Sequence, residues 1–541
     1  MTSILTRCAR SSTKTLLAGL ILCAGCVSDP RVVRVYDGKV VEGRYVTPDG
    51  YAAYLRAVIA EENGDLKGAL SQLQMAVAED DDDAEVWSRV GEVRCKAPPT
   101  DKTAHAEADH AFARALKADS GYAGALAAKG RCLLSRGDHE AAAELAKRGL
   151  VADPGNVGLD ALLVRADGRR PTAQLREHAI ALTVAHGDRA AAWDALVAWS
   201  RARHDAELLA RGLEGLLRAA PTRAPEVERG VLDLLGAGQL ALARRVAASI
   251  TDAPPHLLVR GPHDATVGRL AVDEALARGE RDLAVRRATK AHVELVEVAA
   301  RAALLERREV ATEIAHAVLA AEPNASAARM VLAAVDAKAG KALDAKESVP
   351  ELVVLLLADR IASAGGADAA KAFVERIAKR PLALHDPLAG PLAVDLAARG
   401  IVGEGALGPE LRIELAARRR EPPPAAPKEA DVDARHELLF HALTEPSGSA
   451  AKSLAASLAS AIDRDPVVAF ATARIALASG PSGKGTVDRL RQALASAPGS
   501  ALLLSALVEL AKRQGTDDLQ PARTRLMAVA RTPAERALAS E

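Results

Sequence analysis

The sequence of 541 residues has few aromatic side chains and no excess of charge of either sign. Phe, Trp and Tyr make up 2% of it although 49% of the residues are hydrophobic, so small aliphatic side chains must build the core. The 71 basic and 71 acidic residues cancel, which excludes recruitment of nucleic acid by the overall field of the protein. No basic stripe interleaved with aromatic residues is present either, so no nucleic-acid partner is expected.

The apolar run near the N-terminus, residues 16–22, is too short to cross a membrane, because a spanning helix needs about 20 apolar residues. Basic residues precede the run, and small residues separate it from Cys26: Arg7, Arg10 and Lys14 lie before it, and Ala24 and Gly25 lie after it. This arrangement resembles a bacterial lipoprotein signal peptide. The alternatives are an ordinary secretory signal followed by a coincidental cysteine, or an unprocessed N-terminus.

The resemblance implies that residues 1–25 are removed and that Cys26 becomes the lipidated N-terminus. More than one acyl chain makes such an anchor stable. In well-studied sorting systems an Asp directly after the cysteine favours retention at the inner membrane, and here that residue is Val27. The expected location is therefore the cell envelope, on the periplasmic face of the outer membrane.

Only two of the five cysteines, Cys95 and Cys132, would remain free after processing, because Cys8 and Cys23 leave with the signal. In an oxidising periplasm the two could pair. Two thiols in a protein of this size do not form a disulfide framework, and the buried role of a small hydrophobic residue is the interpretation we favour. Pairing stays open at this point.

Alanine makes up about a fifth of the chain and is the strongest helix former. Before the helices begin, two β-prone runs, residues 32–36 and 39–42, flank Asp37-Gly38, a dipeptide that suits a tight hairpin turn. We therefore expect a short N-terminal β-hairpin within residues 26–46. Thr47 followed by Pro48 then matches the start of a helix.

A repeated pattern of small and large residues dominates the chain after Pro48. Trp87, Val90 and Gly91 precede Ala108 and Phe112 at a spacing that resembles the tetratricopeptide repeat (TPR), in which small residues allow two helices to pack closely. The resemblance implies an all-α fold, an α-solenoid of TPR-like helical hairpins. Each hairpin buries its apolar face only against its neighbours.

Domain boundaries follow from where the repeat pattern and the prolines lie. The expected order is a signal peptide (1–25), a lipid-anchored segment with the hairpin (26–46), a TPR-like solenoid (47–417, clearest at 50–156), a Pro-rich linker (418–433) and a C-terminal helical-hairpin domain (434–541). Three consecutive prolines in the linker exclude helix. The arginine triplet 418–420 at its start is interpreted as a solvated helix end.

Three motifs come close to catalytic signatures without matching them. His436 is followed by Glu437, as in the zinc-peptidase motif, but the second histidine, His441, comes five residues after the first instead of four. This spacing places the two imidazole rings about 140° apart around the helix axis. The segment 479–486 lacks the residues of a phosphate-binding loop and comes after a helical pattern. The acidic run 79–83 lacks the spacing of a calcium loop and is interpreted as a helix cap. No metal, cofactor or catalytic residue is therefore expected.

TPR arrays usually bind peptides or partner helices on the concave face made by the first helix of each hairpin. Carrying the family's ligand-facing positions onto the clearest repeats predicts an acidic, Tyr-bearing groove formed by Tyr51, Tyr54, Glu61, Glu85, Ser88, Glu92 and Arg131. The expected function is a non-enzymatic, lipid-anchored scaffold that binds envelope proteins or peptides in secretion, outer-membrane assembly, polysaccharide export or motility. The alternative is a periplasmic hydrolase carried on a helical-repeat scaffold, and the oligomeric state is left open.

Overall fold

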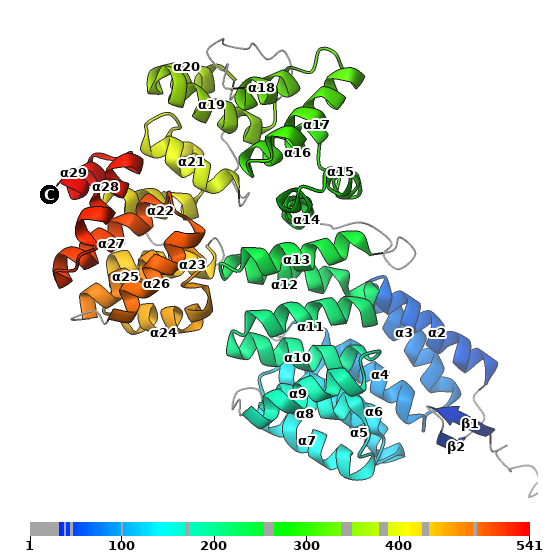
Figure 1. The fold of residues 1–541 in the computed structure, drawn as a ribbon. Coiled ribbons are helices and arrows are strands. Elements are labelled where there is room, and N and C mark those ends of the chain that lie inside the picture. Colours follow the sequence, from blue (N-terminus) through cyan, green and yellow to red (C-terminus); the bar gives the residue numbers. More distant parts are fainter. Residues whose placement is uncertain are drawn as a thin grey trace, which may run out of the picture. The chain divides into compact units, whose positions relative to one another are not determined.

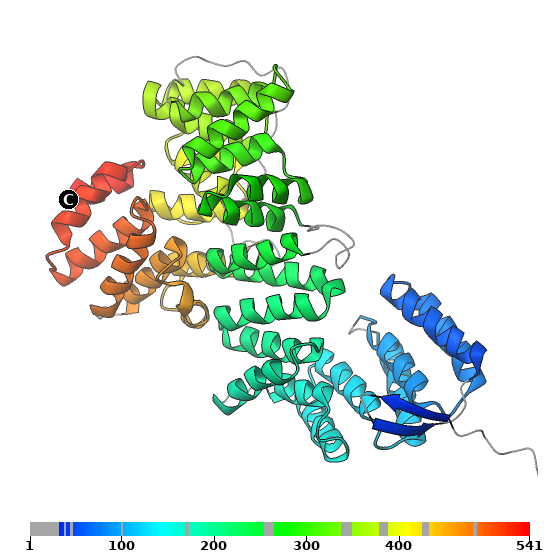
Figure 2. The same ribbon diagram turned by 45° about the vertical axis from the view of Figure 1, so that its right-hand side comes forward.

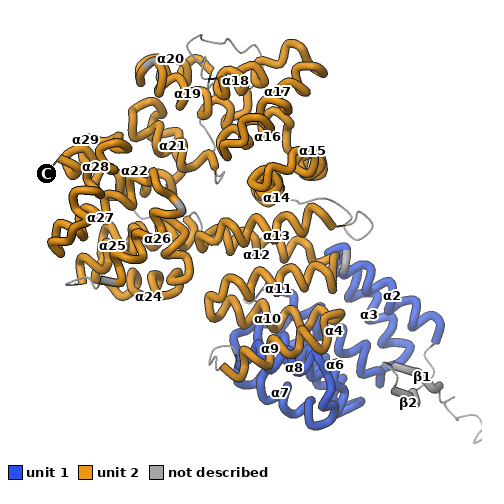
Figure 3. Tube along the Cα trace, viewed as in Figure 1, with its two compact units in different colours: residues 1–167 blue, residues 168–541 orange. Residues whose placement is uncertain are grey.

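The computed structural model describes residues 32–36, 39–43, 47–98, 101–167, 173–253, 264–336, 349–377, 388–424, 432–479 and 484–540. The signal-peptide region, Cys26 and the predicted Asp37-Gly38 turn lie outside these residues. The chain divides into two compact units, residues 1–167 (unit 1) and 168–541 (unit 2), which Figure 3 colours separately. The predicted all-α class is confirmed, since 28 α-helices account for most of the described chain (Figure 1).

Unit 1 begins with two short antiparallel strands where the sequence predicts a hairpin. Strand β1 (Val32–Tyr36) pairs with β2 (Lys39–Gly43) so that Val32 faces Gly43 and Tyr36 faces Lys39. The helices after them are α2 (Pro48–Glu62), α3 (Leu66–Glu79), α4 (Ala84–Cys95), α5 (Lys102–Ala118), α6 (Ala123–Ser135), α7 (His139–Ala152) and α8 (Val157–Asp167). Each even-numbered helix from α2 to α6 packs on the next one as a hairpin.

Side-chain caps set the starts of these helices. The Thr47 hydroxyl accepts a hydrogen bond from the Gly50 N–H at 3.0 Å, with Pro48 in the first turn as predicted. In the acidic run, Asp83 caps α4 by accepting from the N–H groups of Glu85 and Val86. Gly64 lies between α2 and α3 with φ of +79°, a conformation that glycine adopts without strain.

The small residues of the repeat pattern pack as the TPR resemblance requires. Phe112 of α5 is fully buried against Gly91 of α4, where an added Cβ would lie 2.6 Å from the Phe112 ring. Gly130 of α6 makes a different close contact, with the first helix of the following hairpin, since a Cβ there would lie 2.2 Å from Leu162 of α8. The spacing read from the sequence therefore corresponds to close helix contacts in unit 1.

Cys95 and Cys132 form a disulfide, so the interpretation favoured from the sequence, two unpaired buried cysteines, was wrong. The bond joins the C-terminal turn of α4 to α6 across 37 residues of sequence, with the two Cα atoms 5.8 Å apart. That Cα separation lies within the usual range for disulfides. The pair thus links the first helices of two successive hairpins.

Unit 2 contains the remaining helices. They are α9 (Ala173–Ala185), α10 (Ala190–Arg203), α11 (Ala206–Ala219), α12 (Ala224–Gly236), α13 (Leu240–Asp252), α14 (Ala265–Arg278), α15 (Arg281–Lys290), α16 (Leu295–Leu304), α17 (Arg308–Ala321), α18 (Ser326–Val335), α19 (Glu351–Gly365), α20 (Ala367–Ile377), α21 (Ala389–Ala398), α22 (Pro409–Arg419), α23 (Ala434–Thr444), α24 (Ser449–Ser457), α25 (Pro466–Ser479), α26 (Lys484–Ser496), α27 (Ala501–Gln514), α28 (Leu519–Val529) and α29 (Pro533–Ser540). Short 3₁₀ turns, η1 (Pro221–Arg223), η2 (Glu404–Ala406) and η3 (Ala459–Ala461), lie between them.

Helix α22 belongs to two hydrophobic cores of unit 2. Leu411 and Leu415 join the core built by α14 to α21, while Ile413 and Ala417 join the core built by α23 to α29. The chain divides into its two compact units after Asp167, and the linker predicted at residues 418–433 stays a prediction. A helix that contributes to both cores couples the C-terminal helices to those before them.

The arginine triplet is not a fully solvated helix end, because Arg418 is buried and Arg419 is half-buried, although Arg420 is exposed. Arg418 is buried and donates to Glu535 of α29 at 2.7 Å, and its side chain also pairs with Asp395 of α21 at 3.2 Å. Arg419 pairs with Glu404, and Arg420 pairs with Glu509 of α27. The interpretation from sequence was wrong because the acidic partners lie far away in the chain, where local charge patterning gives no signal.

Unit 2 also turns back on itself, so that segments far apart in the chain lie side by side. Gln239, before α13, donates from Nε2 to the Ser460 hydroxyl at 3.3 Å, across 221 residues of sequence. Gly238 has φ of +73°, and a Cβ there would lie 2.8 Å from the side chain of Asp465. The helices coloured orange in Figure 2 accordingly approach the green ones of α12 and α13.

Among the described residues, no helix combines the length and apolarity needed to span a membrane.

Candidate functional site

Five of the predicted partner-binding residues come together on the face formed by α2, α4 and α6, here termed the first-helix face. They are Tyr54, Glu61, Glu85, Glu92 and Arg131. The Tyr54 hydroxyl donates to Glu85 Oε1 at 2.9 Å, linking α2 to α4. Burial, together with the neighbouring Glu85 carboxylate, raises the pKa of Tyr54, so the phenol stays protonated and keeps donating.

The first-helix face is less acidic than the sequence suggested, because basic side chains neutralise its carboxylates. Glu61 pairs with Arg89 at 2.7 Å and with Lys96 at 2.6 Å. Glu92 pairs with Arg89 at 3.2 Å and with Arg131. Sequence reasoning included Arg131 but missed Arg89 and Lys96. The three-residue spacing of Arg89 from Glu92 was an available signal. Lys96 pairs with Glu61 of another helix, for which local spacing gives no signal.

The two other predicted residues, Tyr51 of α2 and Ser88 of α4, take no part in this network of ion pairs and hydrogen bonds. Ser88 is buried, so surface contact between its side chain and a partner is not expected. Tyr51 is 57% exposed, and Leu55 and Ile59 are 43% and 57% exposed at successive four-residue steps along α2. Because residues three and four apart are neighbours on a helix, this apolar stripe lies beside Tyr54 of the first-helix face.

A second site, which the sequence did not reveal, lies in unit 2. An open cavity of about 830 Å³ is lined by parts of α12, α14, α21, α22, α23, α25, α27 and α28 and their flanking turns. Its wall contains several carboxylates: Asp264, Asp395, Glu410, Glu414, Asp433 and Asp465. Arg418, Arg435 and Arg531 line it as well, so charged groups of both signs stand among a larger apolar lining.

His436 of α23 is fully buried next to this wall, between two carboxylates. Its Nδ1 lies 2.7 Å from Asp433 Oδ1, and its Nε2 lies 2.7 Å from Glu414 Oε1. Burial alone would lower the pKa of His436, but hydrogen bonds to Asp433 and Glu414 outweigh it and raise the pKa to about 10. Asp433 keeps its charge as well, since His436 lowers its pKa to about 2 against the effect of burial.

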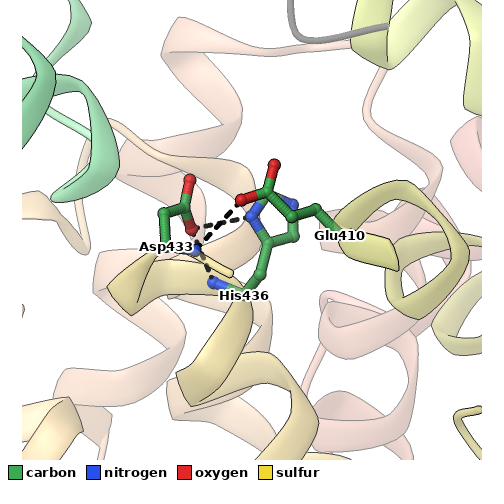
Figure 4. A group of neighbouring side chains, drawn as sticks. All are labelled: Glu410, Asp433 and His436. Carbon is green, nitrogen blue, oxygen red and sulfur yellow. Dashed lines mark hydrogen bonds and ion pairs between the residues drawn. The ribbon is translucent and has the colours of Figure 1, made fainter. Parts of the chain in front are cut away.

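The local sequence explains how Asp433 reaches the imidazole. Asp433 is the N-cap of α23 and accepts from the His436 backbone N–H at 3.0 Å, so its carboxylate lies directly over the ring three residues later. Glu410 of α22 accepts from the Asp433 backbone N–H at 3.0 Å. The ligand atoms of Glu410, Asp433 and His436 all lie within 4.8 Å of one another (Figure 4).

Comparisons with known proteins add little to this description. No protein-family model matches the sequence, and no curated protein matches it. Among solved structures, a Naa15/Naa10 complex bound to HypK-THB aligns over 89% of this chain and 68% of that chain, at 13% identity and a TM-score of 0.22. The human IFIT1 dimer with PPP-AAAA aligns over 89% of this chain and 90% of that chain, at 12% identity and a TM-score of 0.21. TM-scores at this level do not establish a common fold, so the fold assignment rests on the helices of this chain.

Proposed function

We propose that the protein is a non-enzymatic scaffold that binds partner proteins or peptides and is held in the bacterial cell envelope by a lipid on Cys26. The observation that carries the proposal is the exposed stripe of Tyr51, Leu55 and Ile59 on α2, next to the polar network of the first-helix face. Apolar surface rimmed by polar groups is typical of protein interaction sites. Secretion, outer-membrane assembly, polysaccharide export and motility are the processes that such a scaffold would serve.

The disulfide supports the export part of the proposal. Disulfides persist in oxidising compartments such as the bacterial periplasm and are rare in the cytosol. Cys95 and Cys132 are paired in the folded chain, as expected for a protein that works outside the cytoplasm. The short N-terminal apolar run followed by Cys26 is the second, independent support for export.

A photo-crosslinking amino acid placed at Tyr51 tests the binding surface in intact cells. We expect discrete adducts with other envelope proteins when the probe replaces Tyr51 or Leu55, because both side chains are exposed beside the first-helix face. The matched control is the same probe at Val151, which is 85% exposed at the end of α7, the second helix of its hairpin. Equal adducts from all three positions, or none from Tyr51 and Leu55, would contradict the proposed surface.

Replacement of Cys26 by Ser tests the anchor. The wild-type chain is expected to incorporate labelled palmitate and to sediment with membranes, since more than one acyl chain is needed for stable anchoring. The Cys26→Ser chain should lose the label and leave the membrane fraction. Retention of the label in the variant, or a lack of label in the wild type, rules out lipidation at this residue.

A further inference from the structure

We propose that Glu410, Asp433 and His436 bind a divalent transition-metal ion of the zinc class at the wall of the cavity in unit 2. The three side chains come from the start of α22 and from the N-terminal end of α23, which the fold brings together. This site is separate from the first-helix face, so its test is independent of the proposed scaffold function.

The donor set favours zinc over magnesium or calcium. One imidazole nitrogen and two carboxylate oxygens lie within 4.8 Å of one another, and a single ion can contact all three after small side-chain movements. Magnesium and calcium prefer an all-oxygen set, whereas imidazole suits Zn²⁺ and its neighbours in the first transition row. Three protein ligands leave at least one coordination position for water.

Glu414 holds the imidazole in the orientation that a metal ligand requires. Its Oε1 lies 2.7 Å from His436 Nε2, and both side chains are buried. A histidine that binds a metal through one nitrogen usually donates its other N–H to a carboxylate or carbonyl group. Glu414 occupies that outer position, which leaves Nδ1 to face Asp433 and the ion.

The charges around the site can accommodate a cation. The cluster has two cationic groups, Arg435 and the imidazole of His436. It has four carboxylates, those of Glu410, Glu414, Asp433 and Asp465. Arg435 is shared between Asp433 at 3.0 Å and Asp465 at 3.3 Å. The carboxylates outnumber the cationic side chains at the cluster, so its charge favours a cation over an anion.

The cavity provides access and room for water ligands. Glu410, Glu414 and Asp433 all line the volume of about 830 Å³, while His436 lies behind them in the core. An ion at this point would join α22 to α23 and would be reached from the cavity side. His441, the other histidine of α23, is not part of the cluster, in agreement with the five-residue spacing that separates the two rings.

Metal binding by the full-length folded chain tests the proposal, with Zn²⁺ and Co²⁺ as probes. We expect one ion at this site by equilibrium dialysis and metal analysis, and a visible Co²⁺ absorption band that Zn²⁺ removes. His436→Gln and Glu410→Gln should each weaken binding at least as much as the loss of an outer-shell partner does, about 10–100-fold. The matched control is His441→Gln on the same helix, which should bind as the wild type does.

Several results would overturn the site. These are no bound Zn²⁺ in the wild type, unchanged binding in both Glu410→Gln and His436→Gln, or an equal loss in His441→Gln. Circular dichroism establishes which variants are folded. Should His436→Gln fail to fold, Glu410→Gln decides the question, because Glu410 is only partly buried and an amide oxygen can still accept from the Asp433 N–H.

Discussion

Replacing Arg301 by Met is expected to lower the free energy of unfolding of unit 2 by about 3–5 kcal/mol, the range for breaking a buried ion pair at one partner. Arg301 of α16 and Asp273 of α14 are both fully buried, and two parallel hydrogen bonds of 2.6 Å join the guanidinium to the carboxylate. The Met variant removes the two short hydrogen bonds to the buried Asp273 carboxylate and leaves Arg244, 3.7 Å away, as the ion-pair partner that remains. Urea unfolding measures the change, followed by fluorescence of Trp193 and Trp199 in a Trp87→Phe background.

Two comparison variants separate the buried charge from a general loss of packing. Arg201→Met removes an exposed ion pair with Asp233 and should cost no more than about 1 kcal/mol, as surface pairs usually do. Arg301→Met combined with Asp273→Leu should recover most of the lost stability, because the buried carboxylate that lost its two short hydrogen bonds is removed as well. If the double variant is as unstable as Arg301→Met alone, the explanation through the buried carboxylate is wrong.

The parts of the fold that the sequence predicted are those determined by local spacing. Helix starts follow from Thr47, Pro48 and Asp83. The packing of Gly91 on Phe112 follows from the repeat template. Each of these signals joins residues that are near in sequence or separated by one repeat, where the geometry of a helical hairpin decides the contact.

Contacts between distant parts of the chain were not predictable in this way. The Arg418–Glu535 pair spans 117 residues, and the closure at Gln239–Ser460 spans 221. No periodicity relates such partners, so the arginine triplet was interpreted as solvated. The cluster around His436 was not predicted for the same reason. Asp433 caps the helix of His436 and is near it in sequence, but Glu410 and Glu414 come from another helix.

The first-helix face was predictable in part: its residue positions follow from the repeat pattern, but their ion-pair partners do not. Family positions brought Tyr54, Glu85 and Arg131 to one face as predicted from the TPR resemblance, although their role in binding stays a prediction. The template gives positions but no partners, so it did not predict that Arg89 and Lys96 neutralise Glu61. A partner of this face would therefore meet a balanced polar network beside an apolar stripe, instead of an acidic groove.

Replacing Phe112 by Ala is expected to lower the free energy of unfolding of unit 1 by about 3–5 kcal/mol, as for other fully buried aromatic residues. Phe112 is completely buried among Ala108, Ala128 and Cys132, so its loss leaves a cavity. Trp87 reports unit 1 alone once Trp193 and Trp199 are replaced by Phe, because the chain has three tryptophans. Urea unfolding of that background measures the change.

A double-mutant cycle with Gly91 tests the packing contact itself. Gly91→Ala alone should cost about 1–3 kcal/mol, because its Cβ would lie 2.6 Å from the Phe112 ring and the closely packed helices must shift. With Phe112→Ala already present the methyl group enters the vacated space, so the added cost should vanish or reverse. The expected coupling is about 1–3 kcal/mol. Additive effects would mean that Gly91 is required for a reason other than contact with Phe112. The close contact between these two residues would then not explain the TPR-like packing of this hairpin.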